Sequence, residues 1–281
     1  MIAVLSEAMT QRLIRTTGAL RRTAKVAPGA SLRCGVDLGT ASIIEVVLDD
    51  DDRPVACAME RCGVARDGLV VDYMGAIGVV RRLTAQLRER LGADITRAAI
   101  ATPPGTSAGN TNTHRYIVEA AGLEVEASLD EPTAANSVLG ITDGAVVDIG
   151  GGTTGLAVFQ NSRVTYVADE PTGGTHMNLV LMGRYGLTFD QAEAFKCDPA
   201  HADEVRAAVR PVAEKMATIV RDHVAGHSVD QVWLAGGTAA QEGIATVFAE
   251  VLGVPVHRPV HPMMVTPLGI ALNVPKKGGP C

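Results

Sequence analysis

Short apolar runs joined by glycine-rich turns form two similar units along the chain. Each unit has an apolar run, a turn, a second run, another turn and a third run. Apolar runs of this length between turn residues are typical of buried β-strands. Because internal repetition constrains a fold strongly, we expect two related lobes. The predicted strands are residues 32–37, 42–48 and 55–60 in the first unit, and 145–149, 155–159 and 164–168 in the second.

Between and after these units, apolar residues recur at the spacing of amphipathic helices. Residues 75–91 place Ile77, Val80, Leu83 and Leu87 on one stripe, which matches the 3.6-residue period of an α-helix. The same reasoning predicts further helices at 112–121, 209–223 and 239–252, and further strands at 98–101 and 232–235.

The first 30 residues have a different pattern. Met9, Leu13 and Leu20 lie near one helical face, and Glu7 is the only acid beside five basic residues, Arg12, Arg15, Arg21, Arg22 and Lys25. Pro28 and Gly29 then end the pattern. Residues 1–31 therefore read as a basic amphipathic helix and a linker. Two interpretations stay open: the helix docks on the protein's own body, or it is an arm for another surface, because its charge opposes that of the acidic remainder.

Composition and charge exclude several classes of protein. The 281 residues are 47% apolar and 20% charged, with a formal net charge of −6, so a disordered chain is excluded and a sizeable core is available. A nucleic-acid binder usually has a basic face and stacking aromatics, whereas this chain is acidic and 3% aromatic. No apolar run approaches the roughly 18–20 residues of a membrane helix. The five cysteines form no CxxC pair, so we expect reduced thiols in a cytoplasmic protein.

An acidic residue precedes the glycine-rich turn in each repeated unit. Asp37 precedes the turn with Gly39 and Thr40, and Asp148 precedes the turn with Gly150, Gly151, Gly152 and Thr153. Glycine turns allow backbone N–H groups to face a phosphate closely, and a carboxylate beside them suits Mg²⁺, which prefers oxygen ligands. Two such turns predict a clamp that holds a triphosphate from both sides.

The glycine spacing also allows a different interpretation, which we reject. Gly150, Gly152 and Gly155 satisfy the G-x-G-x-x-G pattern. A dinucleotide site needs that pattern to open a helix. Here a predicted strand follows it, at residues 155–159, so the pattern does not indicate a dinucleotide site.

Three further segments contain small or acidic residues at helix starts. Glu131 stands at the start of a helix whose first turn holds Pro132, where a carboxylate can position a water molecule. Gly236 and Gly237 leave room for a base and ribose, and Thr238 is suited to an N-cap. Residues 267–273 form another small-residue helix.

Taken in order, these segments resemble the nucleotide-binding motifs of the actin, sugar-kinase and DnaK-type chaperone superfamily. The correspondence covers most of residues 33–273: phosphate-one loop, first connecting helix, phosphate-two loop, adenosine motif and second connecting helix. The chain is also similar to the EutJ family of ethanolamine-utilisation proteins, in the segments RDGLVVD, PPGT, AAGLEVEASLDEPTAA, VVDIGGGTTG, ADEPTGGTHMN, VRPVAEKMATIV and WLAGG.

The resemblance implies a fold and its division. The fold is expected to be a two-lobed α/β actin-like ATPase fold, with ribonuclease H-like lobes around a nucleotide cleft and no C-terminal peptide-binding domain. Lobe I is expected at 32–143 and lobe II at 144–262. The second connecting helix and a tail are expected at 263–281.

The resemblance also implies ligands and site residues. The expected ligands are ATP or ADP with Mg²⁺. Asp37 and Asp148 would hold the metal through water, and Glu131 would position the attacking water. The residues implied to contact nucleotide are Gly39, Thr40, Gly150, Gly151, Gly152, Thr153, Gly173, Gly174, Gly236, Gly237 and Thr238.

The chain departs from DnaK-type enzymes at two points. There is no clear counterpart of the cleft lysine that these enzymes carry before the first connecting helix. Ala239 and Ala240 stand where they carry an arginine that stacks on adenine. Weaker cationic stabilisation of phosphate charge implies slow hydrolysis, and the missing arginine implies modest affinity.

The function implied by the resemblance is that of an ATP-binding, chaperone-like protein of ethanolamine microcompartments. It would assist assembly, or protect or reactivate an enclosed enzyme, with at most slow ATPase activity. Its partner would be the shell or the enclosed amine-degrading enzyme, reached through residues 1–28, and not a nucleic acid or a membrane. One alternative is a nucleotide-gated scaffold or filament-like protein with little hydrolysis. Another is a small-molecule kinase, which the short chain disfavours.

Overall fold

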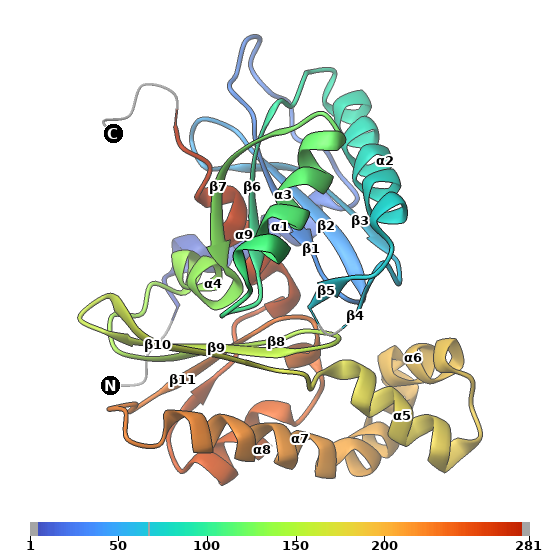
Figure 1. The fold of residues 1–281 in the computed structure, drawn as a ribbon, viewed down its shortest axis with the longest axis vertical. Helices are drawn as coiled ribbons and strands as arrows, with labels where there is room; N and C mark the ends of the chain where they lie inside the picture. Colours follow the sequence, from blue (N-terminus) through green and yellow to red (C-terminus); the bar gives the residue numbers. More distant parts are fainter. Residues whose placement is uncertain (1–4, 67, 277–281) are drawn as a thin grey trace.

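Two α/β lobes of the same topology stack one above the other (Figure 1). The computed structural model describes residues 5–66 and 68–276. Lobe I holds a five-stranded sheet in the order β3-β2-β1-β6-β7, and lobe II holds one in the order β10-β9-β8-β11-β12. In both sheets the first three strands are antiparallel and the central strand pairs in parallel with the next. The equivalent orders confirm the repeat expected from the sequence.

Lobe I is built from the first repeated unit and two helices on one face of its sheet. The helices α2 (Tyr73–Leu91) and α3 (Ala108–Ala120) pack there over a core of aliphatic side chains. A short hairpin leads from the third strand to α2. The strands are β1 (Arg33–Leu38), β2 (Ser42–Leu48), β3 (Pro54–Arg61), β6 (Arg97–Thr102) and β7 (Glu124–Asp130), and the hairpin is β4 (Ala65–Arg66) with β5 (Leu69–Val70).

Lobe II repeats this plan with more helices, of which α7 and α8 lie below its sheet and α5 and α6 lie at its right-hand end in Figure 1. Its strands are β8 (Gly144–Ile149), β9 (Thr154–Gln160), β10 (Arg163–Glu170), β11 (Val232–Ala235) and β12 (Val256–His257). Its helices are α5 (Gly174–Tyr185), α6 (Phe189–Cys197), α7 (Ala202–Val224) and α8 (Ile244–Leu252), with short 3₁₀ turns η1 (Pro199–His201), η2 (Thr238–Ala240) and η3 (Pro262–Met264).

Two helices cross between the lobes. α4 (Glu131–Leu139) follows β7, and α9 (Val265–Leu272) follows η3. Their backbones approach so closely that a Cβ added at Gly269 would overlap the carbonyl oxygen of Ala134. Small residues therefore set the distance between the lobes at this crossing.

The N-terminal helix, α1 (Glu7–Ala19), docks on the protein's own body. Leu13, Thr16 and Ala19 are buried, and Leu13 packs in the core shared by the second face of the lobe I sheet, α4 and α9. The interpretation of a helix docked in cis is therefore the one that the structure shows. Residues 1–4 of the predicted helix and 277–281 of the predicted tail lie outside the described residues.

Three helices differ from the sequence prediction. The helix expected at 112–121 begins at Ala108. The helix expected at 209–223 begins at Ala202, because Val205 and Ala208 are buried and hold its first two turns against the core. Pro211 lies inside the helix without ending it. The helix expected at 239–252 is divided into η2 and α8, because Gly243 adopts a left-handed φ of +81° that interrupts helical geometry. Sequence reasoning also missed β7, α5 and α6.

The helices and cysteines of the described residues bear on two expectations, the absence of a membrane helix and the presence of reduced thiols. Within residues 5–66 and 68–276, no helix is both long and apolar enough to cross a membrane. Cys34, Cys57, Cys62 and Cys197 form no disulfide among the described residues, and Cys281 lies outside them.

A glutamate lies in the core of lobe I. Glu45 of β2 has no exposed surface, and the Thr84 hydroxyl of α2 donates to its two carboxyl oxygens at 3.0 and 3.1 Å. Burial raises the pKa of Glu45 to about 8, although Thr84 and Arg88 oppose the shift. The carboxyl group is therefore mainly protonated in the folded protein at neutral pH.

Glu45→Gln is expected to stabilise the protein increasingly as the pH rises. The folded pKa lies above the unfolded value of about 4.3. The contribution of protonated Glu45 to the free energy of unfolding is therefore fully present below that value. It falls by about 1.4 kcal/mol per pH unit up to about pH 8, whereas glutamine stays neutral at every pH. Thermal unfolding from pH 5 to pH 8 should show a Tm gain over wild type that widens with pH. Glu89→Gln, at an exposed position of α2, is the control. A gain that does not change with pH would contradict the assignment.

Candidate functional site

The two acidic residues singled out in the sequence occupy equivalent places. Asp37 is the penultimate residue of β1, and Asp148 is the penultimate residue of β8. These are the central strands of the two sheets. The turns that follow them meet, because a Cβ added at Gly151 would lie 2.9 Å from the Cβ of Ala41. The fold thus brings the two predicted glycine turns together.

Backbone hydrogen bonds join the second glycine turn to the start of α5. The N–H of Gly174 donates to the carbonyl oxygen of Gly150 at 3.0 Å, and the N–H of Thr175 donates to that of Gly151 at 2.8 Å. A Cβ at Gly173 would come within 2.7 Å of both of these carbonyl oxygens. A glycine is therefore required at 173 for this close packing.

The segment after β11 completes this side of the site. The hydroxyl of Thr238 donates to the carbonyl oxygen of Gly150 at 2.7 Å, and so does not cap a helix as predicted. Gly236 has φ of +89° and packs against Asp148 and Ile149, where a side chain would overlap both. Gly237 does not pack against Asp148; a Cβ added there would lie 3.7 Å from the Cγ of Met263. The predicted residues Gly150, Gly151, Gly173, Gly174 and Thr238 therefore pack against one another, and Gly236 packs against Asp148.

Four carboxyl groups share the region between the lobes. Burial, and then the charge of Asp148, raises the pKa of Asp37 to about 7. Burial raises the pKa of Asp148 to about 6, against a hydrogen bond from the Thr266 hydroxyl. The pKa of Asp169 also rises to about 6, chiefly through burial. Burial raises the pKa of Glu131 well above its usual range, and Asp148, Asp37 and Asp169 add to the shift.

Glu131 lies at the first position of α4, as the sequence predicts. Asp130 caps this helix by accepting a hydrogen bond from the N–H of Thr133 at 2.8 Å, and Pro132 occupies the first turn. α4 begins at the end of β7, which pairs with β6, and β6 pairs in turn with β1. The charges of Asp148 and Asp37 reach Glu131 and add to the rise of its pKa. Sequence and structure therefore agree on the place of this carboxylate.

The residues present suit a hydrated divalent cation. Among the described residues, no three His, Cys, Asp or Glu side chains lie close enough together to hold a metal ion directly. The buried Oδ1 of Asp169 has no hydrogen-bond partner in the described part of the chain. Surplus negative charge and an unpaired carboxylate oxygen both fit a Mg²⁺ ion that keeps its waters.

Sequence reasoning missed a polar group on α6. The ammonium of Lys196, 12% exposed, donates to Glu193 at 2.6 Å and to the Gly174 carbonyl oxygen at 3.4 Å. Asn178 also donates to Glu193, at 2.8 Å. The i, i+3 spacing of Glu193 and Lys196 was a sequence signal, but nothing local showed that α6 faces Gly174. Thr266 and Asp169 were missed for the same reason.

Two contacts link the lobes at the edge of the site. Arg61, the last residue of β3, lies 3.8 Å from Glu193 and 3.9 Å from the Sγ of Cys197, both on α6. In the β4–β5 hairpin, a Cβ at Gly68 would lie 3.6 Å from the Cγ2 of Thr153. Residues of lobe I therefore touch the lobe II elements that surround the glycine turns.

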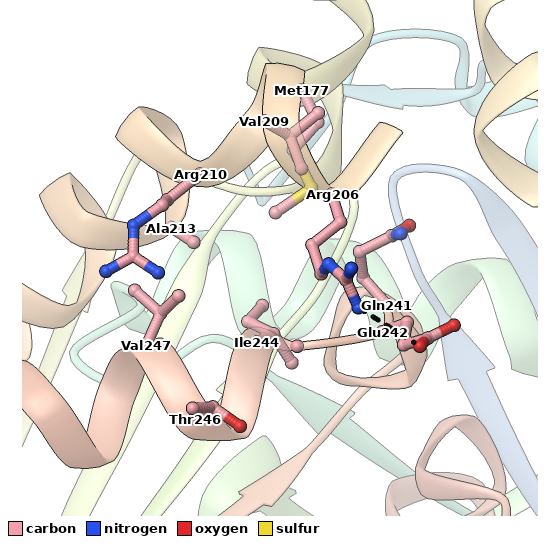
Figure 2. Close-up of a pocket in the computed structure, with 11 residues that line it drawn as sticks. Met177, Arg206, Val209, Arg210, Ala213, Gln241, Glu242, Ile244, Thr246 and Val247 are labelled. Carbon is pink, nitrogen blue, oxygen red and sulfur yellow. Dashed lines mark hydrogen bonds and ion pairs between the residues drawn. The ribbon is translucent and has the colours of Figure 1, made fainter. Parts of the chain in front are cut away.

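A cavity of about 250 Å³ opens beside η2, between α5, α7 and α8. Figure 2 shows Arg206 directed toward Glu242 across it, at 3.4 Å. This cation is therefore already paired, and the aliphatic walls suit an apolar group better than a phosphate. The residues that line the cavity are Met177, Arg206, Val209, Arg210, Ala213, Gln241, Glu242, Gly243, Ile244, Thr246 and Val247.

Comparison with known proteins identifies the family. The chain is 42% identical over 264 residues to the ethanolamine utilization protein EutJ of Escherichia coli (strain K12), and this match covers 94% of the chain and 93% of that protein. The chain belongs to the EutJ family. Residues 112–267 also match a family model described as type IV pilus assembly protein PilM.

Solved structures agree with this assignment. The crystal structure of EutJ from Carboxydothermus hydrogenoformans matches with a TM-score of 0.88 and 45% identity, over 94% of this chain and 98% of that one. MreB5 of Spiroplasma citri bound to ADP matches with a TM-score of 0.66 and 16% identity, over 86% and 95%. The second likeness shows the fold, which is the actin-like ATPase fold expected from the motifs.

Proposed function

We propose that this protein binds ATP or ADP with Mg²⁺ between its lobes and acts as a chaperone-like factor of ethanolamine microcompartments. It would assist assembly, or protect or reactivate the enclosed amine-degrading enzyme. The convergence of two glycine turns on a group of carboxylates is the observation that supports nucleotide binding. Membership of the EutJ family and the resemblance to DnaK-type motifs support the cellular role.

The proposed nucleotide would lie along the surface formed by the glycine turns. Phosphates would face the N–H groups of the two turns, at Gly39, Thr40 and residues 150–153. The nucleoside would lie toward Gly174 and Gly237, beside Lys196. Asp37 and Asp148 would hold Mg²⁺ through water, and the ion would neutralise phosphate charge.

Hydrolysis is expected to be slow. Glu131 would orient a water molecule, but burial and the neighbouring carboxylates raise its pKa, which opposes the charged form. Lys196 is held by Glu193 and by the Gly174 carbonyl oxygen, which places its charge on the α5 side of the glycine turns. A cation at the transferring phosphate contributes strongly to such reactions, and Mg²⁺ would be the main source of that charge.

The test combines a binding titration with an enzyme recovery assay. Purified protein titrated with Mg-ATP by calorimetry should show saturable binding, which EDTA should abolish because the aspartates need the cation. Inactivated ethanolamine-degrading enzyme incubated with the protein should then recover activity only when ATP is present. ATP-dependent sedimentation without recovery would instead favour the nucleotide-gated scaffold. Absence of binding would overturn the nucleotide part of the proposal.

A further inference from the structure

Only one face of the N-terminal helix packs against the rest of the protein. Leu13 and Thr16 are completely buried, and the guanidinium of Arg90 on α2 donates to the carbonyl oxygen of Ala19 at 2.6 Å. The N–H of Ala24 then donates to the carbonyl oxygen of Val55 at 2.8 Å. α1 is therefore a fixed part of the surface rather than a detachable arm, and its deletion would open the core.

The opposite face of α1 is exposed and basic. Ile14 is 42% exposed, and a Cβ at Gly18 would meet no atom within 4 Å. The N–H groups of Arg21 and Arg22 both donate to the Gly18 carbonyl oxygen, so the helical path continues beyond Ala19. We call this face the basic stripe, which comprises Gln11, Ile14, Arg15, Gly18, Arg21 and Arg22.

The arginines of the basic stripe form no ion pair with the acids that the structure describes. Within residues 5–66 and 68–276, ion pairs form at many other arginines but at none of Arg15, Arg21 and Arg22. Residues 1–30 hold five basic residues and one acidic residue, whereas the other 251 hold 20 basic and 30 acidic residues. The basic stripe is thus a local positive surface on an acidic molecule.

We propose that the basic stripe is the docking surface for an acidic amphipathic helix of a partner protein. Arg15, Gly18 and Arg22 follow the i, i+3, i+7 spacing of one helical row, which complements acids at helical spacing on a second helix. The missing side chain at Gly18 lets a second backbone come close, and Ile14 offers an apolar contact beside the charges. Nucleotide binding is not required for this docking.

Other anionic surfaces fit the stripe less well. A helix that binds a membrane inserts its apolar face, but here that face is already buried against β3 and α9. A nucleic acid would extend beyond one helix and meet the acidic remainder. In addition, residues 1–30 contain no aromatic side chain for base stacking.

The test uses a fluorescent 18-residue peptide, built from Ala, Leu and Glu with Glu at i, i+3 and i+7, and measures its anisotropy at low and high salt. Wild-type protein should bind it, and Arg15→Glu/Arg22→Glu should weaken binding by about tenfold or more. A peptide with Lys in place of Glu should bind this double variant better than it binds the wild type. Arg163→Glu/Arg184→Glu, at exposed positions of β10 and α5, should change affinity by less than about twofold.

A second variant separates helix packing from general charge attraction. Gly18→Leu leaves every charge in place, and its Cβ would meet no atom within 4 Å. It should therefore fold normally, yet it should weaken peptide binding because it blocks close approach. Unchanged affinity in Gly18→Leu would overturn helix docking. Absence of peptide binding, or tighter binding to anionic phosphatidylglycerol vesicles or duplex DNA, would also overturn it. Calorimetric titration with Mg-ATP tests the nucleotide site separately, and its outcome does not depend on whether the peptide binds.

Discussion

Asp148→Asn is expected to abolish binding of Mg-nucleotide while making the ligand-free protein more stable. Asp148 is 6% exposed and lies among Asp37, Glu131 and Asp169, whose pKa values its charge helps to raise. Asparagine removes that charge and can still accept the hydrogen bond from Thr266. It supplies no charge for a hydrated cation, so binding should be lost.

The gain in stability should depend on pH. The folded pKa of Asp148 is about 6, above the unfolded value of about 3.9. The contribution of protonated Asp148 to the free energy of unfolding is therefore fully present below about pH 4 and is lost as the pH rises toward 6. Above pH 6 the variant should gain on the order of 1–3 kcal/mol over wild type, and near pH 4 the two should be equal.

Calorimetry with Mg-ATP and urea unfolding at pH 5 and pH 7.5 measure the two effects of Asp148→Asn together. Asp230→Asn, at an exposed position of lobe II, should change neither quantity. A purely structural Asp148 would give the opposite pattern, in which the variant loses stability and keeps its affinity for nucleotide.

Gly269→Ala is expected to destabilise the protein by about 3 kcal/mol or more. The added Cβ would overlap the carbonyl oxygen of Ala134 in α4, and a backbone contact cannot be relieved by rotating a side chain. Forced separation of packed elements typically costs about 1–3 kcal/mol, and sometimes more. Since each kcal/mol lowers Tm by roughly 2–4 °C at this size, a fall of about 6 °C or more is expected.

Gly183→Ala is the matched control for this substitution. Gly183 lies inside α5, and a Cβ there would meet no atom within 4 Å. Alanine favours a helix over glycine by about 1 kcal/mol, so the control should raise Tm slightly. Differential scanning calorimetry measures the Tm of the two variants against that of the wild type. Equal Tm values would show that α4 and α9 can separate at little cost.

The sequence by itself determined the features that depend on short stretches of chain. Alternating apolar runs and turns gave the two repeated units, because a buried strand needs few residues and glycine marks its end. Asp37 and Asp148 could be placed beside their turns, and Glu131 at its helix start, because each lies within a few residues of the pattern that positions it. The two-lobed fold and the EutJ family were implied by the resemblance of these and other segments to known families.

Only the tertiary structure decided the features that depend on residues distant in the sequence. Nothing near Lys196 or Thr266 indicates that α6 faces Gly174 or that α9 brings a hydroxyl to Asp148. The two possible dockings of α1 have the same helical pattern, and the buried contact of Leu13 distinguishes them. The raised pKa values of the site arise in the same way, because burial and repulsion exist only once separate strands and helices have packed together.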